Sequence, residues 1–169
     1  MAVQTTYGSI TKGLAGQIAD LSYNSALNSY AAGGTIAYGL AVVRASGATS
    51  GDVVNAGSGG SAEAAVTVMG IAIRETAKEN QRTGATSSEN AQYHANDTAG
   101  VMEDGYVYIA LAGGAASDAG TAVNVTHATG VFTRATGTGV GACNNVVLAE
   151  YFDGTAGAIV KVRINRNAS

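Results

Sequence analysis

The chain contains no tryptophan and no proline, one cysteine, and few charged residues. Because a single cysteine has no intramolecular partner, Cys143 excludes a disulfide framework and a site built from several cysteines. Charged residues make up 12% of the 169 positions, against about 25% in an ordinary soluble domain. A surface with so little charge is either covered by Ser, Thr, Asn and Gly or hidden against other subunits. We expect both, with a merely polar monomer as the alternative.

The sequence also lacks the segments that direct a chain to membranes or to nucleic acid. No basic stretch followed by an apolar one opens the chain, as a signal peptide requires, and no apolar run approaches the roughly 18 residues of a membrane span. The nine Lys and Arg residues are scattered and the net charge is −3, whereas binding to phosphates requires a basic face. We therefore expect synthesis in the cytoplasm, no membrane partner and no nucleic-acid partner.

Short strands take the place of long helical periodicity. In residues 106–111 the side chains of Val107, Ile109 and Leu111 share one face, and residues 159–164 alternate in the same way. A period of two predicts half-buried strands. Further strands are expected at residues 35–44, 64–74, 121–126 and 145–152, and residues 21–34 favour a strand over a short helix.

Glycine-rich turns separate these segments, which predicts an all-β chain: a small antiparallel β-barrel or sandwich, jelly-roll-like or β-tulip-like. Residues 1–20 are rich in Gly, Thr and Ser and are expected to form an extended N-terminal arm. Residues 21–169 are then one domain. Residues 75–98 are polar and form the longest expected loop, which is typical of a functional or mobile segment.

Groups that could hold a metal are few. His94 lies three residues before Asp97, but nothing at metal-ligand spacing links this pair to His127. Both histidines are expected to be solvated loop residues, with a metal site as the weaker alternative. No cofactor is expected.

Groups that could catalyse a reaction are also few. Cys143 has no base close to it in the sequence, so we expect a small buried or interfacial residue. Glu103 and Asp104 are adjacent, so on a strand they point to opposite faces, and we expect two solvated charges. These features predict that the chain is not an enzyme.

Tyrosine is the abundant aromatic residue, with 8 Tyr against 2 Phe. Its apolar ring and wet hydroxyl suit contacts that form between parts already folded. The alternative is that Tyr simply favours strands.

An ordered series of short motifs runs along most of the chain. They are residues 14–20 (LAGQIAD), 36–43 (IAYGLAVV), 69–74 (MGIAIR), 105–109 (GYVYI), 120–123 (GTAV), 129–132 (TGVF) and 157–163 (GAIVKVR). In this order they resemble the opening segment, strands and turns of the structural cement proteins of tailed phages. Departures from that pattern are Ala37 for Pro, Tyr38 for Phe, Tyr108 at a Trp-like position and Thr121 for Asp.

The resemblance implies a virion structural protein on the outer surface of the phage head. Such a protein binds the major capsid protein as a homo-oligomer, more often a trimer than a dimer, and clamps neighbouring capsid subunits after the shell has expanded. We expect its capsid contacts in the arm and in the polar loop. The candidate residues are Leu14, Gln17, Ile18, Asp20, Arg74, Glu75, Lys78 and Arg82.

Two other functions stay open at this point. A phage fibre or other receptor-binding β-module is also often rich in Ser, Thr, Gly and Ala, although the collagen-like or coiled-coil repeats of many fibres are missing. A small oligomeric β-barrel enzyme would need titratable groups gathered across subunit interfaces.

Overall fold

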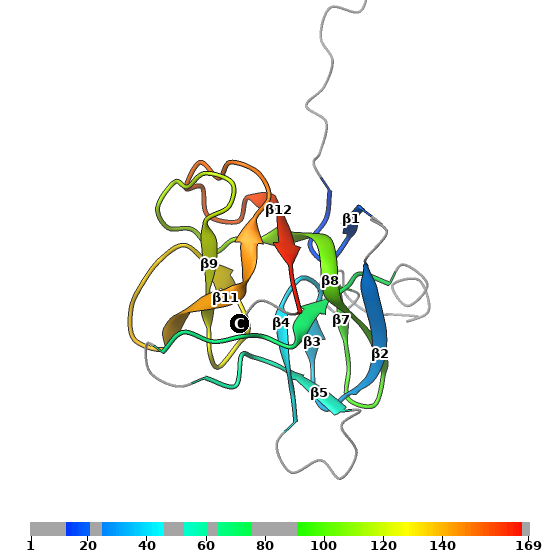
Figure 1. The fold of residues 1–169 in the computed structure, drawn as a ribbon. Helices are drawn as coiled ribbons and strands as arrows, with labels where there is room; N and C mark the ends of the chain where they lie inside the picture. Colours follow the sequence, from blue (N-terminus) through cyan, green and yellow to red (C-terminus); the bar gives the residue numbers. More distant parts are fainter. Residues whose placement is uncertain (1–12, 21–24, 46–52, 61–63, 76–90, 167–169) are drawn as a thin grey trace, which may run out of the picture.

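The computed structural model describes residues 13–20, 25–45, 53–60, 64–75 and 91–166, and contains no α-helix among them (Figure 1). The predicted all-β fold is confirmed. The strands are β1 Ile18–Asp20, β2 Ala26–Ala32, β3 Ile36–Ala37, β4 Ala41–Arg44, β5 Val53–Ala56, β6 Gly70–Ala72, β7 Gln92–Tyr93, β8 Thr98–Ala110, β9 Ala122–Thr126, β10 Phe132–Thr133, β11 Val140–Leu148 and β12 Ile159–Ile164.

One half of the molecule is a closed ring of strands. In this ring β8 pairs with β2, β2 with β5, β5 with β4, β4 with β6, and β6 returns to β8. Every pairing is antiparallel except β2–β5, where Ala31 lies opposite Val53. Since closure leaves no strand edge unpaired, this ring is a small barrel.

The other half is a curved sheet with the order β10-β9-β11-β12-β8. Its edge strand β10 hydrogen-bonds to the chain that leaves β8. The Ala112 N–H donates to the Phe132 carbonyl at 3.0 Å, and the Arg134 N–H donates to the Gly113 carbonyl at 2.7 Å. The sheet therefore curls back onto the continuation of β8. Figure 1 shows β9 and β11 on one side of the molecule and β2 on the other, with β8 between them.

Strand β8 belongs to both halves and changes partners near Gly105. Residues 98–104 pair with β2, and residues 105–110 pair with β12. Gly105 has a φ of 132°, a backbone conformation that residues with a side chain rarely adopt. Just before it, the register between β8 and β2 skips Glu103. An extra residue of this kind is a β-bulge, which bends a strand and turns a side chain.

Two hydrophobic clusters fill the two halves. In the barrel, Ile36, Val42, Val54, Tyr93 and Val101 are buried together. The alternation of β8 separates this cluster from the second one, because neighbouring residues of a strand face opposite sides. The second cluster includes Met102, Val107, Ile109, Leu111, Val123, Val125, Phe132, Val146, Leu148, Val162 and Ile164.

Residues 64–69 cross from the barrel to β11 and join the two halves. Val66 forms a single parallel bridge with Cys143. Beyond it, the side chain of Asn145 takes the place of a strand. Its Oδ1 accepts the Val68 N–H at 3.0 Å and its Nδ2 donates to the Val68 carbonyl at 2.8 Å.

Most predicted strands are confirmed, with different bounds. Residues 106–111 fall largely in the second half of the longer strand β8, while 159–164, 121–126 and 21–34 contain β12, β9 and β2. Only β6 forms within 64–74, since the earlier residues cross to β11. The expected loop 75–98 contains β7, because Tyr93 fills the barrel core, and residues 76–90 lie outside the described part.

Candidate functional site

The described part of the arm lies against the body as a short edge strand. β1 pairs with β8, with Ile18 opposite Val107 and Asp20 opposite Tyr106. The Gly16 N–H donates to the Tyr108 carbonyl at 2.8 Å. We call residues 13–20 together with Arg74 and Glu75 the arm face. The boundary between arm and domain at residue 20 stays a prediction.

Glycine is required where the arm crosses the barrel. Gly16 has a φ of 78°, and a Cβ added there would lie 2.8 Å from the Tyr38 Cβ and 2.9 Å from the Arg74 N. The Arg74 N–H donates to the Gly16 carbonyl at 2.7 Å. The backbone of the arm therefore lies so close to the backbone of Arg74 that only glycine fits at position 16.

The Arg74 side chain lies over one ring of a pair of packed tyrosines. The Arg74 guanidinium lies 5.9 Å from the centroid of the Tyr38 ring, which in turn meets the Tyr93 ring edge-on at 5.1 Å. The Tyr93 hydroxyl donates to the Ile73 carbonyl at 2.8 Å, and burial raises the pKa of Tyr93. A cation over a fixed ring gains about 0.5–1 kcal/mol at an exposed site, so Arg74 has a defined position.

The arm face includes six of the eight predicted contact residues, but Ile18 is partly buried and packs against the core of the curved sheet. Leu14 exposes 47% of its surface, and its N–H donates to the Gln17 Oε1 at 3.1 Å. This turn presents an apolar side chain on a fixed backbone. The six are Leu14, Gln17, Ile18, Asp20, Arg74 and Glu75, whereas Lys78 and Arg82 lie outside the described residues.

Glu103 is not the solvated charge that the sequence predicts. It is 2% exposed, accepts a hydrogen bond from the Tyr30 hydroxyl, and forms an ion pair with Arg166 at 2.7 Å. The β-bulge turns it away from solvent, so a run of three residues in β8 is buried. Burial raises the pKa of Tyr30, and the hydrogen bond to Glu103 raises it further. Through these two contacts, Glu103 links Arg166, the last described residue, to Tyr30 on β2 of the barrel.

His127 is also buried, which corrects the prediction of a solvated loop residue. Its Nδ1 lies 2.7 Å from the Ser58 Oγ. The ring fits between two glycines, because a Cβ on Gly60 would lie 2.6 Å from Nδ1 and a Cβ on Gly141 would lie 2.9 Å from Nε2. The Nε2 atom has no hydrogen-bond partner. A nucleophilic Ser–His pair must be reachable by a substrate, and a third group must orient its histidine. The Ser58–His127 pair is buried, and its free ring nitrogen has no partner.

His94 is half-buried rather than fully solvated. The Nε2 atom of its ring is covered and lacks a hydrogen-bond partner. Its backbone N–H donates to the Asp97 Oδ2 at 2.8 Å. The carboxylate of Asp97 therefore serves the backbone of a turn. No group of three His, Cys, Asp or Glu residues that could hold a metal ion occurs within the described ranges. In the same residues, no helix is long and apolar enough to cross a membrane.

Cys143 is buried, as predicted, and its thiol donates to the Asn145 Oδ1 at 3.4 Å. Desolvation raises the pKa of the thiol. Because the thiolate is the reactive form, we expect the native protein to react with a disulfide reagent at neutral pH far more slowly than the urea-unfolded chain. Absorbance of the released thiolate measures both rates. Equal rates would show that the site opens freely.

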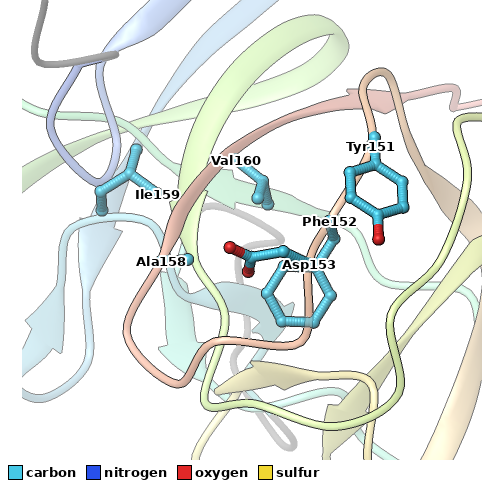
Figure 2. Close-up of a pocket in the computed structure, with 6 residues that line it drawn as sticks. All are labelled: Tyr151, Phe152, Asp153, Ala158, Ile159 and Val160. Atoms are coloured by element: carbon cyan, nitrogen blue, oxygen red, sulfur yellow. The ribbon is translucent and has the colours of Figure 1, made fainter. Parts of the chain in front are cut away.

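A hollow of about 460 Å³ lies beside the loop between β11 and β12 (Figure 2). Tyr151 at its rim is 59% exposed. Among the described residues that line it, Asp153 is the one carboxylate, and its Oδ1 accepts the Thr155 N–H at 2.9 Å.

A second hollow, of about 350 Å³, adjoins the arm face. It is lined by Asp20, which the sequence analysis selected, and by residues that it treated only as parts of strands. These are Tyr106, Val147, Leu148, Ala149, Lys161 and Arg163. The alternation in 106–111 and 159–164 contained the signal, since it placed Tyr106, Lys161 and Arg163 on the outer face.

Comparison with protein-family models identifies one family. Residues 3–165 match the family described as structural cement protein (E217 gp24/Pam3 gp6). Among solved structures, a chain from the capsid of Myoviridae phage XM1 has the same fold with a TM-score of 0.65, at 20% sequence identity over 98% of this chain and 99% of that chain. A search of curated proteins found no match. Because the family match spans nearly the whole sequence, the chain belongs to the structural cement protein family of phage capsids.

Proposed function

We infer that this protein decorates the outside of the phage head and clamps neighbouring major capsid subunits after the shell has expanded. The observation that carries this inference is the family match over residues 3–165. The arm face supports it, because Leu14 is an exposed apolar side chain on an anchored backbone.

Clamping needs several weak contacts made together. A homo-oligomer, a trimer rather than a dimer, would touch several shell subunits at once, and each contact after the first forms at high effective concentration. If the binding site exists only on the expanded shell, occupancy stabilises that state by mass action. This mechanism resists the outward pressure of packaged DNA and needs no chemical step.

The copy number of the chain in purified particles tests this proposal. Quantitative mass spectrometry against the major capsid protein should give about one copy per few capsid subunits. A handful of copies per particle would instead favour a fibre or receptor-binding module, and absence from particles would refute a role in the virion.

Leu14 gives the proposal a test at one residue. We expect Leu14→Ser to weaken binding to expanded shells about tenfold, because burying an exposed leucine side chain against the shell would contribute about 1.5–3 kcal/mol. Leu27 is the matched control, since it is also 47% exposed but lies on β2. Sedimentation of shells with labelled protein measures both affinities. Equal binding by Leu14→Ser and Leu27→Ser would remove the arm face from the interface.

A further inference from the structure

The outer face beside the arm consists of four adjacent strands whose side chains form rows. Asp20 lies opposite Tyr106, Tyr106 opposite Arg163, and Arg163 opposite Val147, which gives one row across β1, β8, β12 and β11. Residues directly opposite on paired strands share a face and contact each other. The hollow of about 350 Å³ lies over this row.

A second row lies next to the first. Lys161 pairs with Tyr108, and the chain of the arm continues the row at Gly16, whose N–H donates to the Tyr108 carbonyl at 2.8 Å. The Lys161 Nζ lies 5.7 Å from the centroid of the Tyr106 ring. We call these two rows the row face. It is continuous with the arm face through residues 16–20.

The row face is rigid and carries two cationic side chains from the same strand. The residues that alternate with it, Val107, Val162 and Leu148, are buried in the core of the curved sheet, so its backbone is fixed. Among the described residues that line the hollow, Lys161 and Arg163 are cationic and Asp20 is anionic. Glu150, which does not line the hollow, accepts the Lys161 backbone N–H with its Oε1 at 2.9 Å. Tyr and Arg are enriched in protein interfaces. Two cations beside a carboxylate are too few to follow a nucleic-acid backbone.

We propose that the row face binds an acidic segment of the capsid protein, with one of its carboxylates seated in the hollow against Lys161 and Arg163. The inference rests on the proposed function and names the chemistry of its partner. Continuity with the arm argues for the shell as the partner, because a shell subunit that contacts the arm face also lies beside the row face. Charge complementarity argues for an acidic segment.

Zero-length cross-linking of decorated particles tests the partner directly. A carbodiimide joins a lysine amine to a carboxylate only when the two are in contact. Peptide mapping should find Lys161 joined to an Asp or Glu of the capsid protein. Lys161→Arg should abolish this product and keep its binding to shells, because the guanidinium retains the charge but does not react. Cross-links from Lys161 to a second copy of this chain, and none to the capsid protein, would overturn the proposal.

Charge reversal gives a second readout. Arg163→Glu should weaken shell binding about tenfold, whereas Arg44→Glu, an exposed arginine at the end of β4, should bind like wild type. Thermal melts should show that both variants stay folded, since both side chains are exposed. Wild-type affinity for Arg163→Glu would refute the row face alone. Failure of the wild-type protein to bind shells would refute the proposed function.

Discussion

Asn145→Ala is expected to lower the free energy of unfolding by about 3 kcal/mol. The amide of Asn145 is 2% exposed and makes both hydrogen bonds to the backbone of Val68. Removing it leaves a buried N–H and a buried carbonyl without partners, and each such group costs about 1–3 kcal/mol. The substitution therefore acts on the crossing that joins the barrel to the curved sheet.

The neighbouring residue provides the control. Asn144 lies on the same strand but points to solvent, so Asn144→Ala should change stability by less than about 0.5 kcal/mol. Urea unfolding followed by tyrosine fluorescence measures both variants. If Asn145→Ala unfolds at the same urea concentration as Asn144→Ala, then water replaces the amide and the crossing does not depend on it.

Gly141→Ala is expected to be at least as damaging, with a loss of about 3 kcal/mol or failure to fold. A Cβ at this position would lie 2.0 Å from the Ala64 carbonyl oxygen and 2.8 Å from the His127 Cε1. The first of these atoms belongs to the backbone of the crossing segment, and the second to a ring held by Ser58. Neither can move without breaking contacts between the two halves.

Gly34→Ala is the matched control for Gly141→Ala. The nearest atom to a Cβ at Gly34 is the Asn55 Oδ1 at 3.9 Å, an ordinary contact. The same substitution should therefore be neutral, or stabilise slightly by restricting the unfolded chain. Circular dichroism melts compare the two. A melting temperature for Gly141→Ala close to that of Gly34→Ala would mean that residues 64–69 adapt easily.

Periodicity predicted the strands well where one face is buried and the other is wet. Residues 159–164 and the second half of β8 alternate without interruption, so their class and inner face were evident from the sequence. The same alternation fails at Glu103, because a bulge has no signature in the side chains around it. Its partner Tyr30 is 73 positions away, a distance over which local patterns carry no information.

The candidate site was also predicted only in part from the sequence. Composition and the motifs of residues 14–20 pointed to the arm, and the structure places Arg74 beside it through a backbone hydrogen bond. The row face was not predicted, because it exists only once β1, β8, β12 and β11 lie side by side. Asn145 lies in the predicted strand 145–152, but its role was missed because its partner Val68 is 77 positions away in the sequence.

The sharing of β8 has a consequence for the order in which the chain folds. Neither the barrel nor the curved sheet can form completely until residues 98–110 have left the ribosome, because both pair with that strand. Contacts so distant in sequence slow folding, since chain entropy is lost before they form. β1 also cannot pair before this strand has been made, because its partners there are Tyr106 and Val107. The arm is made first, and it reaches its position only after most of the protein has been synthesised.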